Sequence, residues 1–353
     1  MVLSNELTKK LGIRYPVIQG PFGGGLSSIE LLTTVSNLGG LGSYGAHHLP
    51  PKAISQLITD IRAQTSEPFA INLWVSSRDH FIDGVSRRDF DEYSRRFEPL
   101  YAAVDAELPE FTETFSHDFD QQVEAAIDAR APVLSFVFGV PGPQIIKKCR
   151  DNGIVTIGTA TTVDEAILLQ TSGVDIVVAT GFEAGGHRVS FLKEPEDCLT
   201  GTFALIPQVA DSLTVPIVAA GAIADARGVR AAMALGAQGV QVGTAFLAAN
   251  QSGTSVKHRD ILFSDRARHT VLSRAFTGRL ARFIENETIN FVEKTEGLPL
   301  RFPLQSYFTG PIKAAAAKHN NNDFASLYAG QGAPLLKHHE AEQMFNSLIV
   351  DFT

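Results

Sequence analysis

Eight short apolar runs constrain the fold of this chain most strongly, because a segment long enough for a helix separates most of them from the next. Several runs are continuously apolar, as expected of strands in a parallel sheet that is covered on both faces. The expected strands are residues 15–19, 41–44, 69–74, 133–138, 155–158, 176–179, 217–220 and 239–242. This alternation predicts an α/β fold, a (β/α)8 TIM barrel, and favours it over an open doubly wound sheet.

Several of the intervening segments carry the start and stop signals of helices. Ser27-x-x-Glu30 predicts a capping box that opens a helix over residues 29–38, and Thr162-x-x-Glu165 predicts a second over 165–171. Asp225 is expected to cap a helix over 227–235. Glycines that should end helices just before the next strand are Gly39-Gly40, Gly153, Gly173 and Gly236.

Two regions depart from this alternation. Residues 76–125 separate the third and fourth strands by more than a simple crossover, and the helical spacing of their aromatic residues predicts a helical insertion. Residues 250–345 contain no clear strand, so we expect a mostly α-helical C-terminal lobe beside a barrel of residues 1–249, with 346–353 as a tail. Long additions to a barrel commonly form lids or substrate walls, but the insertion could equally be a brace or the contact surface of a homodimer.

Charge and cysteine content exclude several classes of protein. The net charge is −8 at pH 7 and no long basic run occurs, which argues against a nucleic-acid partner. No apolar stretch is long enough to span a membrane, and the N-terminus lacks the apolar core of a signal peptide. The two cysteines form no CxxC pair and no HExxH-type spacing occurs, so we expect a cytoplasmic protein without a metal site.

The loops that follow the strands are where a barrel carries its active site. After the first strand, Pro21, Phe22 and Gly23 belong to a stretch with three consecutive glycines, which would let the backbone approach a planar ligand closely. Asn72 is a polar residue inside the third strand. Its amide is expected either to contact a ligand or to bond to a neighbouring strand.

The loop after the sixth strand holds the best catalytic candidate. It follows Thr180 and ends in Gly185-Gly186-His187, which places a histidine directly after two glycines. Because histidine changes its charge near neutral pH, His187 at this face could take a proton from carbon or hold an anionic substrate. The other histidines stand in charged segments or in adjacent pairs such as His47-His48 and are weaker candidates.

The loops after the seventh and eighth strands predict a phosphate site. Gly221 and Ala222 follow the seventh strand, and Gly243 and Thr244 follow the eighth, which contains Gln241. Backbone amides in such loops, together with a threonine hydroxyl, suit a phosphate monoester. Residues 40–45 match GxGxxG, but the match runs through a strand instead of opening a helix, so a dinucleotide-binding fold is not supported.

Six segments, in order along the chain, resemble the nitronate monooxygenase family, formerly called 2-nitropropane dioxygenases. They are residues 19–21, 69–73, 135–139, 158–162, 181–187 and 241–247. The most specific is Glu-Ala-Gly-Gly-His at 183–187, which is shared with flavin-dependent enoyl-acyl-carrier-protein reductases. Residues 76–125, 276–282 and 328–331 are similar to the larger, class I members of the family.

The resemblance implies an FMN-binding barrel with an α-helical second domain. It implies oxidation by O2 of alkyl nitronates such as propionate 3-nitronate to a carbonyl compound and nitrite, through a flavin semiquinone. His187 matches the active-site histidine of the family. The residues that stand where the family contacts FMN are Pro21, Phe22, Gly23, Asn72, Thr180, Gly185, Gly186, Gly221, Ala222, Gln241, Gly243, Thr244, Gly330 and Gln331.

Three of these positions depart from the residues usual in the family. Phe22 replaces Met, Thr180 replaces Gln, and Ala222 replaces a glycine whose backbone contact should survive if φ is negative. The family's substrate-binding tyrosines and lysine have no clear counterparts, although Tyr307, Lys313 and Phe302 stand in the right region. An NAD(P)H-dependent flavin reductase of quinones or enoyl thioesters is therefore the alternative function.

Overall fold

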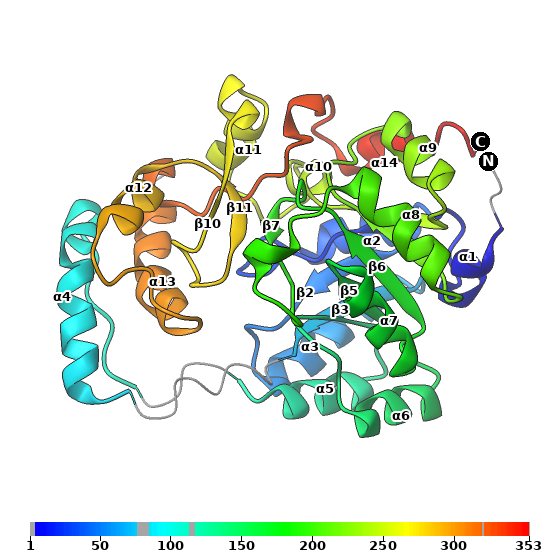
Figure 1. Ribbon diagram of the computed structural model, residues 1–353, viewed down its shortest axis with the longest axis horizontal. Helices are drawn as coiled ribbons and strands as arrows, with labels where there is room; N and C mark the ends of the chain where they lie inside the picture. The colour runs from blue at the N-terminus through cyan, green and yellow to red at the C-terminus, as the bar shows by residue number, and fades with distance from the viewer. Residues whose placement is uncertain (1–3, 76–84, 113–116, 320, 353) are drawn as a thin grey trace.

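Eight parallel strands close into a barrel in the computed structural model, which describes residues 4–75, 85–112, 117–319 and 321–352. The strand order is β1-β9-β8-β6-β5-β4-β3-β2, and a parallel bridge between Ile18 and Leu41 joins the two ends of the sheet. Helices surround the strands, as Figure 1 shows. The predicted (β/α)8 barrel is therefore confirmed, and the carboxyl ends of all eight strands lie at one end of it.

The strands lie close to where the apolar runs placed them. Three have the predicted bounds, and the other five differ by no more than two residues at either end. Continuous burial along most strands explains this agreement, because a strand covered on both faces must be apolar throughout. The barrel strands are β1 (Val17–Gln19), β2 (Gly42–Gly45), β3 (Phe69–Trp74), β4 (Val133–Val137), β5 (Val155–Ala160), β6 (Ile176–Thr180), β8 (Ile217–Ala220) and β9 (Gly239–Val242).

Two of the three predicted helix caps are confirmed, and the third is wrong by one residue. Thr162 and Asp225 cap their helices as expected, but Ser28 caps α2 by accepting a hydrogen bond from the amide of Leu31. The Ser27 hydroxyl instead donates to the Phe22 carbonyl, at 2.7 Å, and so braces the glycine-rich loop. The outer helices are α2 (Ile29–Asn37), α3 (Pro51–Arg62), α5 (Phe119–Asp128), α6 (Pro143–Asp151), α7 (Val163–Thr171), α8 (Thr202–Ser212), α9 (Ala226–Ala234) and α14 (Ala341–Ile349).

A short helix, α1 (Glu6–Leu11), covers the amino-terminal end of the barrel. Leu7 and Leu11 pack into the same buried cluster as the inward-facing strand residues Ile18 and Val178. Hydrogen bonds from Asn5 and Leu7 to Gln238, just before β9, hold the helix there. Because this end is closed by apolar packing, the opposite end is the one available to a ligand.

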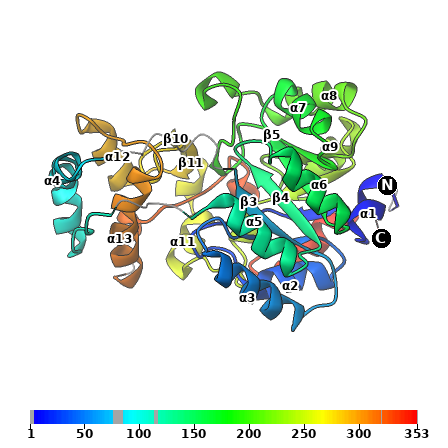
Figure 2. The same cartoon turned by 90° about the horizontal axis from the view of Figure 1, so that it is seen from below.

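A second lobe stands to one side of the barrel (Figure 1, Figure 2). Its core is a cluster of buried aromatic and aliphatic side chains that includes Phe97, Phe283 and Phe308. The predicted insertion divides between the two parts, because α4 packs against α13 of the lobe whereas α5 packs against α3 of the barrel. Residues 76–84 and 113–116 of that insertion lie outside the described residues. The lobe contains α4 (Arg87–Val104), α12 (Glu287–Lys294) and α13 (Leu304–Lys318).

The expectation that residues 250–345 contain no clear strand was wrong. β10 (Thr270–Ser273) and β11 (Ala281–Ile284) form an antiparallel sheet with β7 (Gly186–His187), which belongs to the loop after β6. These strands are short and contain polar residues, so they give no clear apolar pattern in the sequence. The sheet joins the lobe to the barrel at the candidate catalytic residue.

The C-terminal helix α14 packs on the barrel. α14 continues past residue 345, where we divided the lobe from the tail, and its buried face includes Phe345 and Leu348. It packs against α2 and α9, so this helix belongs to the barrel and the predicted boundary cuts through it. The other short helices are α10 (Thr244–Leu247), α11 (Val256–Leu262), η2 (Pro195–Cys198), η3 (Asp265–Arg268), η4 (Asn322–Phe324) and η5 (Ala333–Leu335).

Replacing Phe308 should test whether α4 and α13 form one unit. The Phe97 and Phe308 rings are stacked with centroids 4.9 Å apart, and both are fully buried. We expect Phe308→Ala to destabilise the lobe by about 3–5 kcal/mol and to accelerate hydrogen exchange in both helices. Phe203→Ala is the control, because Phe203 is 77% exposed. Equal effects of the two substitutions on denaturant unfolding would contradict this assignment.

Candidate functional site

A cavity of about 720 Å³ opens at the carboxyl ends of the barrel strands. Its walls come from β3, β4, β6 and β9, from the loops after β1, β6, β8 and β9, and from one face of α13. The volume lies within the range of cofactor and substrate pockets, about 300–1,000 Å³. No carboxylate occurs among the described residues that line it.

Nearly all the residues proposed from the sequence meet in this cavity. The exception is Gln331, which is exposed and is held by a hydrogen bond from its amide to the Glu183 carbonyl. Gly332, the next residue, takes part in the lining instead. The predicted residues that line the cavity are Pro21, Phe22, Gly23, Asn72, Thr180, Gly185, Gly186, His187, Gly221, Ala222, Gln241, Gly243, Thr244 and Gly330.

Glycines at two of these positions let separate segments of backbone meet. A Cβ atom on Gly185 would lie 2.5 Å from the amide nitrogen of Gly330, so neither segment could carry a side chain at that contact. The Thr244 hydroxyl accepts a hydrogen bond from the Gly330 amide, at 2.9 Å. The hydroxyl proton of Thr244 remains available to a ligand. The space beside the neighbouring Gly243 is open, because a Cβ atom added there would meet no atom within 4 Å.

Ala222 departs from what the sequence led us to expect of its backbone. Its φ is 55°, in the left-handed region, whereas the expected tolerance of alanine assumed a negative φ. This conformation costs a residue with a Cβ about 1–2 kcal/mol. Ala222 also packs closely against the C-terminal segment. A Cβ atom added to Gly332 would lie only 2.8 Å from the Ala222 carbonyl oxygen.

Asn72 bonds to the neighbouring strand, one of the two alternatives expected for it. Its side-chain nitrogen donates to the carbonyl and the hydroxyl of Ser135 on the neighbouring strand β4, at 3.2 and 3.0 Å. The residue also lines the cavity. Its donors are therefore engaged within the barrel, and its carbonyl oxygen is the atom available to accept from a ligand.

His187 is held from two sides. Its backbone pairs with Ala281 of β11, and its Nε2 lies 2.9 Å from the Thr277 hydroxyl oxygen. Three aromatic rings surround the imidazole, those of Trp74, Phe138 and Tyr328, with centroids 5.0, 6.1 and 5.8 Å away. The ring is therefore fixed in an apolar wall of the cavity.

This environment keeps His187 uncharged. Burial lowers the pKa of His187 to about 3, and the nearby positive charges of Arg279 and Lys313 act in the same direction. The imidazole is therefore neutral at neutral pH. An anion bound beside it would oppose both effects and raise its pKa.

Lys313 is a cavity residue that the sequence indicated only by its region. It lies on α13, on the helix face formed by Ser306, Gly310 and Ala314, and it lines the cavity. Burial lowers the pKa of Lys313 to about 8, so most of it is protonated at neutral pH. None of the salt bridges within the described residues includes it.

Two further aromatic features of the wall were missed or undervalued in the sequence. The His47 ring stacks on Trp74 with centroids 3.7 Å apart and an interplanar angle of 7°, although its place in an adjacent histidine pair predicts a weak candidate. The Arg279 guanidinium lies over Phe138 and Phe302, at 3.7 and 4.2 Å from their ring centroids. No local sequence pattern predicts these contacts, because they join residues from distant segments.

Two of the three residues noted in the family's substrate region lie where a substrate could reach them. Phe302 and Lys313 line the cavity, whereas the Tyr307 hydroxyl donates to the Glu110 carbonyl, at 2.7 Å, and Tyr307 is not among the lining residues. Tyr328 supplies a phenol in the cavity instead. Burial raises the pKa of Tyr328, so its hydroxyl stays protonated and can donate a hydrogen bond.

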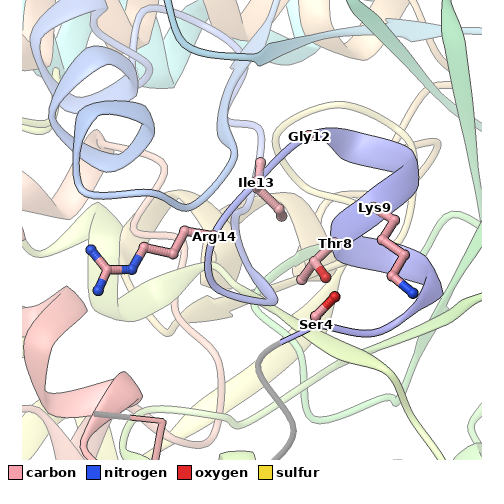
Figure 3. Close-up of a pocket in the computed structure, with 6 residues that line it drawn as sticks. All are labelled: Ser4, Thr8, Lys9, Gly12, Ile13 and Arg14. Atoms are coloured by element: carbon pink, nitrogen blue, oxygen red, sulfur yellow. The ribbon is translucent and has the colours of Figure 1, made fainter.

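A smaller hollow of about 340 Å³ lies beside α1, at the closed end of the barrel (Figure 3). Its two basic side chains, Lys9 and Arg14, point apart in Figure 3 and converge on no common point.

Among the described residues, no group of histidine, cysteine or acidic side chains could hold a metal ion. In the same residues, every helix is too short or too polar to cross a membrane.

Comparisons with known proteins match nearly the whole chain. A model of the nitronate monooxygenase family matches residues 4–351. A probable nitronate monooxygenase of Staphylococcus haemolyticus is 37% identical over 99% of this chain and 97% of its own. The structure of a nitroalkane oxidase from Streptomyces ansochromogenes has a TM-score of 0.85 and 31% identity, and covers 98% and 96% of the two chains. FabK from Thermotoga maritima has a TM-score of 0.75 and 25% identity, over 99% and 96%.

The titration of His187 should reveal its environment. Its pKa is lowered from 6.5 to about 3 in the folded protein, so between these values the unfolded chain binds more protons than the folded one. We therefore expect the difference in free energy of unfolding between wild type and His187→Asn to shift against wild type as the pH falls from 7 to 4. The ring resonances should show no titration near pH 6.5. A titration there, or a stability difference independent of pH, would contradict the buried neutral state.

Proposed function

Because the chain belongs to the nitronate monooxygenase family, we propose that it binds FMN in this cavity and oxidises alkyl nitronates with O2 to a carbonyl compound and nitrite. The observation that carries the proposal is that His187 and Lys313 both line a cavity whose described lining residues include no carboxylate. Such a cavity favours an anionic small molecule over a neutral or cationic one.

The residues present fit FMN. Bare backbone at Gly221 and Gly243 and the Thr244 hydroxyl would hold the phosphate, at the position where barrels commonly bind one. The amides of Asn72 and Gln241 would meet polar atoms of the flavin ring, and the close contact of Gly185 with Gly330 leaves flat backbone beside it. When bound, FMN would supply the redox chemistry that the protein's own side chains lack.

Lys313 and His187 would divide the recognition of the substrate. The Lys313 ammonium would bind the negative charge of the nitronate, and the His187 imidazole would donate a hydrogen bond or accept a proton beside it. A base whose pKa is about 3 removes a proton from carbon poorly. We therefore propose nitronates, which are already anionic, as the substrates in preference to neutral nitroalkanes.

Lys313→Met should separate substrate binding from chemistry. Loss of a charged hydrogen-bond donor costs about 1.5–3 kcal/mol, so we expect KM for propionate 3-nitronate to rise about 10-fold to 100-fold. Nitrite release measures the rate. Lys313→Arg, which keeps the positive charge, should retain more of the affinity than Lys313→Met. An unchanged KM in Lys313→Met would remove this residue from substrate binding.

Thr244→Val should test the phosphate site. The variant keeps the size of the side chain but loses the hydroxyl, so FMN should dissociate about 5-fold to 30-fold more readily, a cost of about 1–2 kcal/mol. Riboflavin, which lacks the phosphate, should bind the variant and wild type alike, and Thr244→Ser should retain FMN. If riboflavin binding weakens as much as FMN binding, Thr244 does not contact the phosphate.

A further inference from the structure

Arg188, the residue after His187, is a buried cation, and its side chain is only 1% exposed. Nη1 donates to the carbonyls of Thr180 and Gly181, at 3.1 and 2.8 Å, and Nη2 donates to the carbonyl of Cys198, at 3.1 Å. Within the residues that the structure describes, Nε has no partner and no carboxylate forms an ion pair with Arg188. Its hydrogen bonds to these residues therefore all go to backbone carbonyls.

Stability alone does not account for this arrangement. Burying a charge costs several kcal/mol, and an apolar residue of similar volume is often as stabilising as a buried ion pair. Burial lowers the pKa of Arg188 to about 10, which leaves it charged at neutral pH. The nearby carboxylate of Glu165 is engaged elsewhere, because it accepts hydrogen bonds from the amides of Thr161 and Phe191, at 2.7 and 2.5 Å.

The carbonyls that Arg188 binds lie at the two ends of the loop that carries His187. Thr180 is the last residue of β6, and Cys198 ends the short helix η2, shortly before α8. A second buried arginine, Arg282 of β11, donates to the carbonyl of Phe182, at 3.0 and 2.9 Å. Guanidinium groups thus hold three consecutive carbonyls at the point where the chain leaves β6.

The backbone of Arg188 is fixed as well. Its amide donates to the carbonyl of Leu280, at 2.8 Å, which continues the pairing of β7 with β11. Two glycines precede His187, and Gly186 has a φ of 79°. Because glycines restrain the backbone little, contacts of the residues that follow them must fix the direction in which the imidazole points.

We propose that Arg188 is a positioning residue for His187, which ties the two ends of its loop together and keeps the imidazole against Thr277. This role rests on the proposed function of His187. A lysine could not replace it, because one ammonium group cannot reach carbonyls on both sides with the fixed fork of a guanidinium. A merely structural arginine would contribute to stability without affecting the environment of His187.

Hydrogen exchange and histidine titration in the full-length protein test this role. In both Arg188→Lys and Arg188→Met, the backbone amide protons of residues 182–190 should exchange with solvent about 10-fold faster than in wild type, because the loop opens more often. The pKa of His187 should rise from about 3 toward its ordinary value as water reaches the ring. Arg188→Lys keeps the charge and much of the length, and it provides the test if Arg188→Met does not fold.

Lys193→Met is the matched control. Lys193 lies on the same loop and forms an exposed ion pair with Asp164, at 3.9 Å, and exposed pairs contribute little. Its exchange rates and His187 titration should match wild type. The proposal is overturned if the Arg188 variants show wild-type exchange at 182–190 and a wild-type His187 titration, whatever their melting temperatures.

Activity measurements separate this inference from the proposed function. In the Arg188 variants, kcat for nitronate oxidation should fall about 10-fold or more while KM changes little, because the binding charge of Lys313 is untouched. If wild-type protein releases no nitrite from nitronates, the proposed function fails, yet the exchange and titration results still decide whether Arg188 positions His187.

Discussion

The pairing of two residues, Gly186 and His187, with β11 is the interaction on which the rest of the site depends. It turns a glycine-rich loop at the mouth of the barrel into a strand, and it connects that strand to the lobe. Thr277, which meets the imidazole, precedes β11, and Lys313 comes from α13 of the same lobe. The barrel and the lobe therefore form the cavity together, and the lobe adds Thr277 and Lys313 to the wall that contains His187.

Burial gives this cavity its chemical character, since no carboxylate occurs in the part of its lining that the structure describes. Burial among aromatic rings lowers the pKa of His187, and Lys313, which has no acidic partner within the described residues, offers a charge that a ligand can satisfy. The strained backbone of Ala222 and the buried charge of Arg188 are further costs that concentrate around the same cavity. Such costs cluster at functional sites, where they hold groups in place before a ligand arrives.

Much of the barrel could be predicted from the sequence because most strands are buried on both faces and several of them are continuously apolar. The loop glycines and His187 followed from the rule that barrels carry their sites at the carboxyl ends of strands. β10 and β11 could not be predicted, because four-residue strands with polar residues produce no periodicity. The stack of His47 on Trp74 and the approach of Lys313 to His187 are tertiary contacts, which no local pattern encodes. The positive φ of Ala222 could not be predicted from the sequence either.

Anaerobic mixing of the purified protein with either propionate 3-nitronate or NAD(P)H tests the central claim most directly. If this cavity holds FMN beside an anion-binding lysine and a neutral histidine, the protein is yellow, and the nitronate changes the flavin spectrum rapidly. NAD(P)H should then change it barely at all, and nitrite should appear when O2 is admitted. Rapid bleaching by NAD(P)H with no response to the nitronate would contradict the account and favour a reductase on the same scaffold.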